Sequence, residues 1–204
     1  MNGKQATRAT RGRPRSFDTD AVLWQVLEAF WARGYEATTV ADLEAATGLH
    51  KGSLYQAFGG KHALFLAALN AYLDAGLDRL RALLGDATDP VEGVRRWLEM
   101  SLSMCESYCA RRGCFAVNTV VEVAPHDAVV DAVLARHFAH VESLVADAIA
   151  RGQRDGSIQS DRSPAELAGF LHTFVSGLVV TGKRELDLQR GREYVDLAMR
   201  LLQA

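Results

Sequence analysis

Apolar residues recur along most of the chain at spacings of three and four, the period of a helix that buries one face. The first such stripe includes Val22 and Phe30, begins at Asp18 or Thr19, and ends near Gly34. Asp and Thr cap helix N-termini, and Gly often follows the last turn. With 4 prolines in 204 residues and 8% aromatic residues, the composition also favours helices over sheets. We therefore predict an all-α protein.

Two short helices and one long helix are predicted next. One short helix lies between Thr39 and Gly48, and the other covers residues 49–58. A pair of glycines then precedes a long helix at residues 61–84. Three helices whose second and third members are joined by a tight turn form a helix-turn-helix.

Helical spacing continues through the rest of the chain. The valine-rich segment 114–123 fits either a strand or a buried helix by its period, and its helical surroundings favour the helix. The other predicted helices cover residues 90–108 and 129–151 and begin near residues 163 and 187.

Charge is unevenly distributed along the chain. The formal net charge is −2, but residues 1–16 carry +5, residues 1–61 carry +2 and residues 62–204 carry −4. This asymmetry suits a chain with one end that meets a polyanion. Arg11, Arg13 and Arg15 would then follow the DNA backbone or enter its minor groove. A merely solubilising terminus is the alternative.

The third predicted helix has a polar outward face without a carboxylate between residues 49 and 56. Gly52 permits close backbone approach, and the Lys51 ammonium is the best candidate for a guanine contact. Thr38 and Thr39 at one helix N-terminus and Lys61 at another are placed to hold phosphates, although capping threonines and a solvated lysine explain them as well. The outward residues of the third helix are His50, Lys51, Ser53, Tyr55 and Gln56.

The runs TTVADLEAATGL (38–49) and KGSLYQAF (51–58), with Lys61, resemble the DNA-binding domain of the TetR family of bacterial repressors. The resemblance implies a homodimer whose third helices read a palindromic operator and whose C-terminal domain binds an inducer. We therefore expect a flexible basic arm (1–16), a helix-turn-helix domain (17–61) and a C-terminal helical domain for ligand binding and dimerisation (62–204). By matching positions, the resemblance implies phosphate contacts for Thr39, Ser53, Tyr55 and Lys61 and base-facing places for Lys51 and Gly52.

The sequence departs from the family pattern where the fourth helix begins. Gly60 stands where a capping Ser, Asn or Asp is usual, and His62 stands where an acidic residue is common. Glycine costs only a few tenths of a kcal/mol as a cap, so the helix is expected to form. We expect His62 to be exposed.

Aromatic and methionine side chains of the later helices are predicted to share one interior. Such a lining, with few polar groups, suits an apolar or aromatic small molecule, and an ordinary core is the alternative. The predicted ligand-binding residues are Trp97, Met100, Met104, Tyr108, Phe115, Asn118, Glu122, Phe138, His172 and Phe174.

Cys114 follows two arginines and opens a helix, and both surroundings make a thiol more reactive. A repressor that senses oxidants or electrophiles through Cys114, with Cys105 and Cys109 as partners, is one alternative. A buried apolar cysteine is the other. His137 and His140 are three residues apart but have no third ligand nearby, so we expect surface histidines and no metal or other cofactor.

The last two helices are predicted to form a four-helix bundle with a second copy of the chain. Residues 167–180 are apolar on several faces, and Gly169 and Gly177 allow a partner helix to approach closely. Burial inside a larger monomer is the alternative.

We thus expect a ligand-responsive, homodimeric transcriptional repressor. The sequence is also compatible with a transcriptional activator. No apolar run reaches the length of a membrane span and no secretory signal is visible, so we expect a cytoplasmic protein with no membrane partner. No catalytic constellation stands out, so we expect no enzyme. The rivals are a non-specific architectural DNA-binding protein and a small helical enzyme or carrier.

Overall fold

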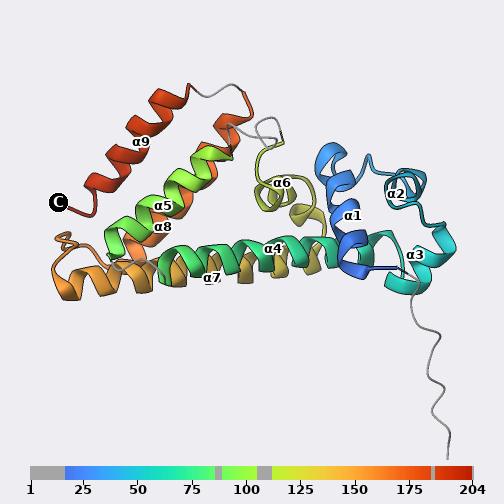
Figure 1. Ribbon diagram of the computed structural model, residues 1–204, viewed down its shortest axis with the longest axis horizontal. Helices are drawn as coiled ribbons and strands as arrows, with labels where there is room; N and C mark the ends of the chain where they lie inside the picture. Colours follow the sequence, from blue (N-terminus) through green and yellow to red (C-terminus); the bar gives the residue numbers. More distant parts are fainter. Residues whose placement is uncertain (1–16, 86–88, 105–111, 185–186, 204) are drawn as a thin grey trace, which may run out of the picture.

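The computed structural model describes residues 17–85, 89–104, 112–184 and 187–203, and within these ranges every regular element is a helix (Figure 1). The predicted all-α class is confirmed for these residues. The helices are α1 (Thr19–Arg33), α2 (Val40–Thr47), α3 (Lys51–Phe58), α4 (Lys61–Gly85), α5 (Pro90–Ser103), α6 (Phe115–Glu122), the 3₁₀ turn η1 (Ala124–His126), α7 (Ala128–Asp155), α8 (Pro164–Gly182) and α9 (Leu188–Arg200).

The helix ends follow from local capping. Asp18 accepts hydrogen bonds from two backbone N–H groups of α1, and Thr39 and Asp42 form a reciprocal capping box at α2. Gly48 ends α2 at a φ of 67°, which favours glycine. Ser163 forms a second capping box at α8. Residues 115–122 are helical, as their surroundings indicated.

Two clusters of buried side chains hold the molecule together, one toward each end of α4. α4 and α7 run side by side along the length of the molecule (Figure 1). The first cluster joins α1–α3 to the first half of α4, α6 and the start of α7; the second joins the end of α4 to α5, α7, α8 and α9. The predicted helix-turn-helix, α1–α3, therefore packs on the same core as α6 and the start of α7, so a shift of α6 or α7 would displace the side chains on which it rests.

By length and composition alone, α8 is the one helix in the described part of the chain that could cross a membrane. The sequence had shown no uninterrupted run of that length, because polar residues such as His172 and Ser176 break it. Leu167, Ala168 and Leu171 of α8 are buried in the second cluster. Because 33% of this helix is buried inside the molecule, α8 packs on the domain through one face.

Candidate functional site

α3 presents a polar surface on a buried anchor. Leu54 is fully buried, whereas Lys51, Ser53 and Gln56 are exposed and Tyr55 is half-buried. A side chain at Gly52 would meet no atom within 4 Å, so the backbone of α3 is open to a close approach there. The geometry suits a helix that inserts into the major groove of DNA.

The N-terminus of α3 has a carboxylate neighbour that sequence reasoning missed. Oε1 of Glu44 accepts the backbone N–H of Lys51 at 2.6 Å and lies 4.0 Å from Nδ1 of the exposed His50. The expected absence of negative charge on this helix therefore holds for its own residues only. Glu44 belongs to α2 and reaches α3 across the Gly48 turn.

Two lysines of the predicted interface lie over aromatic rings. Nζ of Lys51 is 5.4 Å from the ring centroid of Tyr55, and Nζ of Lys61 is 4.5 Å from that of Tyr35. Lys61 also donates to the carbonyl oxygen of Glu36 at 3.4 Å. Cation–π contacts restrict these long side chains while leaving the ammonium groups within reach of phosphates.

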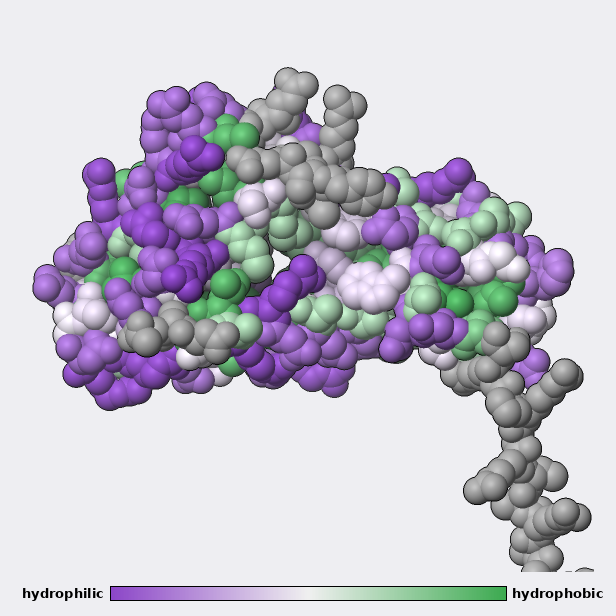
Figure 2. All heavy atoms as spheres, viewed as in Figure 1, coloured by the Kyte–Doolittle hydropathy of each residue, from purple (hydrophilic) through white to green (hydrophobic). Residues whose placement is uncertain are grey.

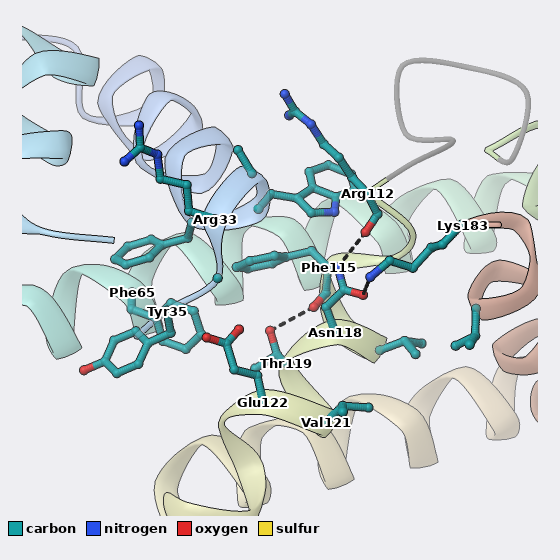
Figure 3. Close-up of a pocket in the computed structure, with 16 residues that line it drawn as sticks. Arg33, Tyr35, Phe65, Arg112, Phe115, Asn118, Thr119, Val121, Glu122 and Lys183 are labelled. Carbon is teal, nitrogen blue, oxygen red and sulfur yellow. Dashed lines mark hydrogen bonds between the residues drawn. The ribbon is translucent and has the colours of Figure 1, made fainter. Parts of the chain in front are cut away.

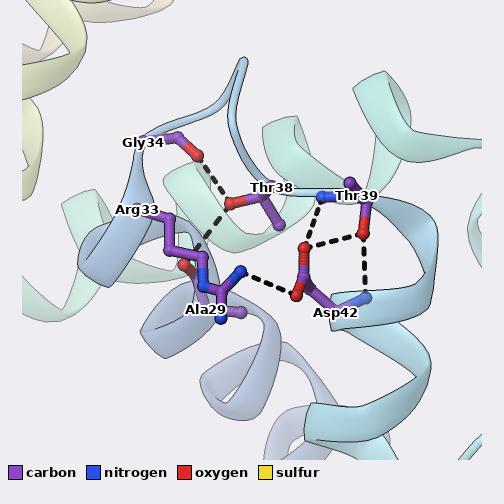
Figure 4. A network of polar contacts seen from close by, with 6 residues as sticks. All are labelled: Ala29, Arg33, Gly34, Thr38, Thr39 and Asp42. Atoms are coloured by element: carbon purple, nitrogen blue, oxygen red, sulfur yellow. Dashed lines mark hydrogen bonds and ion pairs between the residues drawn. The ribbon is translucent and has the colours of Figure 1, made fainter.

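Thr38 does not fit the predicted side-chain contact with DNA, and that expectation is wrong. Its side chain is fully buried, and its hydroxyl donates to the carbonyl of Gly34 at 2.6 Å and lies 3.4 Å from that of Ala29 (Figure 4). The hydroxyl is therefore a structural link between the end of α1 and the start of α2.

Thr39 is exposed at the N-terminus of α2, and its hydroxyl donates to Asp42 at 2.7 Å (Figure 4). This hydrogen bond, more than the nearby Arg33 at 2.9 Å, lowers the pKa of Asp42 below its ordinary value. Thr39 is thus placed for a phosphate but must share its hydroxyl with a carboxylate. The predicted minor-groove residues Arg11, Arg13 and Arg15 lie outside the described residues.

A pocket of about 440 Å³ lies between α1 and the helices α4–α8. Figure 2 shows the surface hollowed above the middle of α4, between α6 and the pair α5 and α8. We call it the apolar pocket, because most of its lining is aliphatic or aromatic. Five predicted ligand-binding residues line it: Trp97, Met100, Met104, Phe138 and His172.

The sequence analysis missed the part of this lining that comes from α1, the first helix of the predicted helix-turn-helix domain. Trp24 and Trp31 of α1 both face the apolar pocket, so all three tryptophans of the chain line it. Nε1 of Trp31 donates to the carbonyl of Gly113 at 3.2 Å, and its ring packs edge-on against Tyr72. A signal was present, since residues seven apart on a helix share one face.

Two histidines supply polar atoms to the apolar pocket. Nδ1 of His172 lies 2.9 Å from Oε1 of Glu142, whereas Nδ1 of His137 is buried without a partner in the described residues. Burial, followed by the proximity of His172 and His140, lowers the pKa of His137 to about 4. The expectation of a surface residue is therefore wrong for His137, because α7 turns it inward; His140 is exposed.

The remaining predicted ligand residues do not share that interior, so the expectation of a single pocket is wrong. Phe115, Asn118 and Glu122 line a second cavity, which we call the junction pocket, between α6, the end of α1 and the end of α8 (Figure 3). Phe174 packs against the second core cluster and lines neither cavity. Tyr108 lies outside the described residues. α6 presents different faces to the two cavities.

Cys114 is the N-cap residue of α6 and is half-buried beside the apolar pocket. Its Sγ lies 3.4 Å from the hydroxyl of Tyr72. The cationic neighbourhood expected from the sequence is compensated in part, because Arg112 pairs with Glu28 at 2.6 Å. Cys105 and Cys109 lie outside the described residues.

His62 has a specific partner, contrary to expectation. Its Nε2 lies 2.6 Å from Oδ2 of Asp127, which caps α7. The pairing arises because η1 brings the cap of α7 beside the first turn of α4, a proximity that no local pattern shows; the side chain of His62 itself stays 44% exposed.

Apolar side chains are exposed on the last two helices. Phe170 and Val180 of α8 are each 50% exposed, and Leu197 of α9 is 60% exposed. Side chains added at Gly169 or Gly177 would meet nothing within 4 Å. Figure 2 shows a mainly hydrophilic surface on one face of this end, with hydrophobic patches where α5, α8 and α9 meet.

Comparisons with known proteins agree with this arrangement. The family model for bacterial regulatory proteins of the tetR family matches residues 26–68, and the model for the tetracyclin repressor-like C-terminal domain matches residues 76–202. The transcriptional repressor ComR of Escherichia coli (strain K12) is 29% identical over 97% of this chain and 94% of its own length. The repressor DhaR of Mycobacterium sp. (strain GP1) is 31% identical over 83% of this chain and 82% of its own length.

A solved structure adds a view of a similar chain with DNA. A cysteine mutant of CifR, a TetR family transcriptional regulator, complexed with 26-bp double-strand operator DNA, is 34% identical to this chain. The match covers 92% of this chain and 98% of the CifR chain, with a TM-score of 0.81.

Proposed function

Because the chain belongs to the TetR family of bacterial regulatory proteins, we propose that it is a homodimeric repressor released from a palindromic operator by a small molecule. The observation that carries this proposal is the exposed polar face of α3 on the buried anchor Leu54. In this proposal Lys51 reads base edges, and Thr39, Ser53, Tyr55 and Lys61 hold phosphates. Such a repressor acts in the cytoplasm, where bacterial DNA lies.

The relatives support repression over activation. ComR and DhaR are both named transcriptional repressors, and CifR has been captured on operator DNA. A repressor needs only to occupy its operator, and the proposed contacts of α3 would be enough for that without further contacts to the transcription machinery.

The exposed apolar side chains of α8 and α9 support a dimer. Two helices from each subunit would cover Phe170, Val180 and Leu197 in a four-helix bundle, with Gly169 and Gly177 allowing close approach. A two-fold axis through this bundle would present two α3 helices to a palindrome. Half-sites are then expected about 34 to 36 Å apart, one turn of DNA.

The apolar pocket is the proposed effector site, and it suits an apolar or aromatic molecule. Because Trp24 and Trp31 belong to α1, an effector in this pocket would touch the DNA-binding domain directly. The effector would release DNA only if it binds more tightly to a conformation in which the two α3 helices no longer match the operator.

Thiol sensing is a second candidate, favoured by the position of Cys114 on the wall of the apolar pocket. An electrophile in that pocket would reach Sγ. If the variant Cys114→Ser is still released from DNA by oxidants and electrophiles as the wild type is, this candidate is excluded.

The experiment that tests the proposal is selection of genomic fragments by the purified protein, followed by footprinting. We expect a protected palindrome, and a panel of apolar compounds should contain one that both releases the DNA and changes the tryptophan fluorescence. Similar affinity for unrelated duplexes would favour the architectural alternative. No DNA binding, together with unchanged behaviour of Lys51→Ala and Tyr55→Ala, would favour the helical enzyme or carrier.

A further inference from the structure

The junction pocket is a second cavity, of about 490 Å³, between the DNA-binding helices and the C-terminal helices. Figure 3 shows α6 along one side, the end of α1 opposite, and Lys183 reaching in from the end of α8. Trp31, Tyr35 and Phe115 give it an aromatic wall. Trp31 and Val117 line both this cavity and the apolar pocket, so they separate the two.

One charged group of the junction pocket is the ammonium of Lys183, held at both ends of its side chain. Nζ donates to Oδ1 of Asn118 at 3.0 Å, and Asn118 is itself held by its bond to the Arg112 carbonyl at 2.6 Å (Figure 3). The stem lies against Gly113, where a Cβ would be 2.9 Å from Cδ of the lysine. The close approach orients this ammonium toward α6.

The other charged group is the carboxylate of Glu122, which is held in a similar way. Its Oε1 accepts the backbone N–H of Glu36 at 3.0 Å. It also lies against Gly34, where a Cβ would be 2.6 Å from the same oxygen. A glycine thus makes room for each of these two charged side chains.

Lys183 and Glu122 differ from the other charged residues of this cavity in the groups with which they form hydrogen bonds. Arg33 is paired with Asp42 at 2.9 Å, and Arg112 is paired with Glu28. Within the described residues, Lys183 and Glu122 contact only neutral groups, an amide oxygen and a backbone N–H. The cavity therefore offers one positive and one negative group, each able to accept an opposite charge.

We infer that the junction pocket binds a zwitterionic amino acid with an apolar side chain. Its carboxylate would bind the ammonium of Lys183, its ammonium would bind Glu122, and its side chain would lie on the aromatic wall. Asn118, which positions Lys183, precedes Glu122 by one helical turn, so both charged groups are held along the same face of α6, where one small molecule with two opposite charges can form charge-assisted hydrogen bonds to both. A simple anion or cation would satisfy only one of the two groups.

Titration calorimetry with the full-length protein tests this inference without DNA. The probes are leucine, methionine and phenylalanine, each compared with its N-acetyl form, which lacks the ammonium, and its amide, which lacks the carboxylate. We expect saturable binding of at least one free amino acid and at least about tenfold weaker binding of both its derivatives. No binding of any free amino acid, or equal binding of a derivative, would overturn the inference.

Two variants locate the site. Lys183→Met keeps the stem that packs on Gly113, and Glu122→Gln keeps an oxygen that can accept the N–H of Glu36. Each should weaken binding at least about tenfold, because each removes one charge-assisted bond. The matched controls Arg184→Met and Glu99→Gln, exposed residues outside the cavity, should bind as the wild type does. Binding that survives both Lys183→Met and Glu122→Gln would place the amino acid elsewhere and contradict the inference, whatever the outcome of the DNA-binding experiments.

Discussion

Nε2 of His62, in the first turn of α4, lies 2.6 Å from Oδ2 of Asp127, the residue that caps α7. Five residues earlier, the carboxylate of Glu122 accepts the N–H of Glu36, between α1 and α2. These two contacts attach the DNA-binding helices to the corner where α6 meets α7. A ligand that moves this corner would act through these contacts on the first turn of α4 and on the loop between α1 and α2.

Asp127 should stabilise the protein in a pH-dependent way. Hydrogen bonds from the backbone N–H of Val130 and then from His62 lower its pKa below the ordinary 3.8. A lowered carboxyl pKa gives stability that is present above 3.8 and is lost as the pH falls through the lower folded value. We expect Asp127→Ala to cost about 1 kcal/mol at pH 7, as for other N-caps, and progressively less below pH 3.8. Urea unfolding of the wild type and of Asp127→Ala across this pH range measures the difference in unfolding free energy. A difference that does not change with pH would contradict the stabilising role of the ionised carboxylate.

His137 should destabilise the folded state in acid. Its pKa falls from 6.5 to about 4 on folding, with His172, His140 and Asp74 as the titratable neighbours, so the unfolded chain takes up a proton first. Stability is then fully present above 6.5 and is lost as the pH falls toward 4. A fully buried group with this pKa would lose roughly 3 kcal/mol; since the ring is partly solvated, we expect a loss on the order of 1 to 2 kcal/mol.

The variant His137→Gln tests this expectation, with His126→Gln, at an exposed histidine that does not act on His137, as its control. The unfolding free energy of His137→Gln should change less between pH 7 and 4 than that of the wild type. Equal pH profiles for the wild type and His137→Gln would show that the buried ring does not contribute.

Gly34 should tolerate no side chain. Its φ of 85° disfavours other residues, and a Cβ there would lie 2.6 Å from Glu122. Gly34→Ala is expected to cost about 2 kcal/mol or more in unfolding free energy. Adding Glu122→Ala should recover the steric part of that cost but not the backbone part. Strict additivity of the two substitutions in a double-mutant cycle would contradict the contact.

Thr38 should matter for folding and not for DNA contact. Thr38→Val leaves the part-buried carbonyl of Gly34 without its donor and is expected to cost about 1 to 3 kcal/mol. Ser103→Ala, which removes an exposed hydroxyl bonded to a carbonyl of its own helix, is the control and should cost little. Under conditions where both variants are folded, operator affinity should equal that of the wild type. If Thr38→Val loses operator affinity and Ser103→Ala does not, the hypothesis that Thr38 contacts a phosphate would be correct after all.

The local features of the fold could be predicted from the sequence because they depend on neighbouring residues. The cap at Asp18, the turn at Gly48 and the capping box at Ser163 each involve residues at most a few positions apart. Helix periodicity likewise predicted the polar outward face of α3, of which Lys51, Ser53 and Gln56 are exposed.

Features that depend on packing between distant elements could not be predicted in this way. The burial of Thr38, the pairing of His62 with Asp127 and the reach of Glu44 to α3 need the helices to be placed in space. The split between two cavities has the same origin, because α6 sends its side chains to both sides. Trp24 joins the apolar pocket only because α1 packs beside α4.

A fluorescence anisotropy titration of the selected operator against a shuffled duplex tests the central claim, that paired α3 helices read specific DNA. We expect two protomers per operator and at least about a thousandfold preference over the shuffled duplex. Lys61→Ala should weaken binding to both duplexes and reduce the salt dependence by about one ion per protomer, whereas Lys51→Ala should lower the preference itself at least about tenfold. A monomer on DNA, equal affinity for both duplexes, or an unchanged preference in Lys51→Ala would contradict the account.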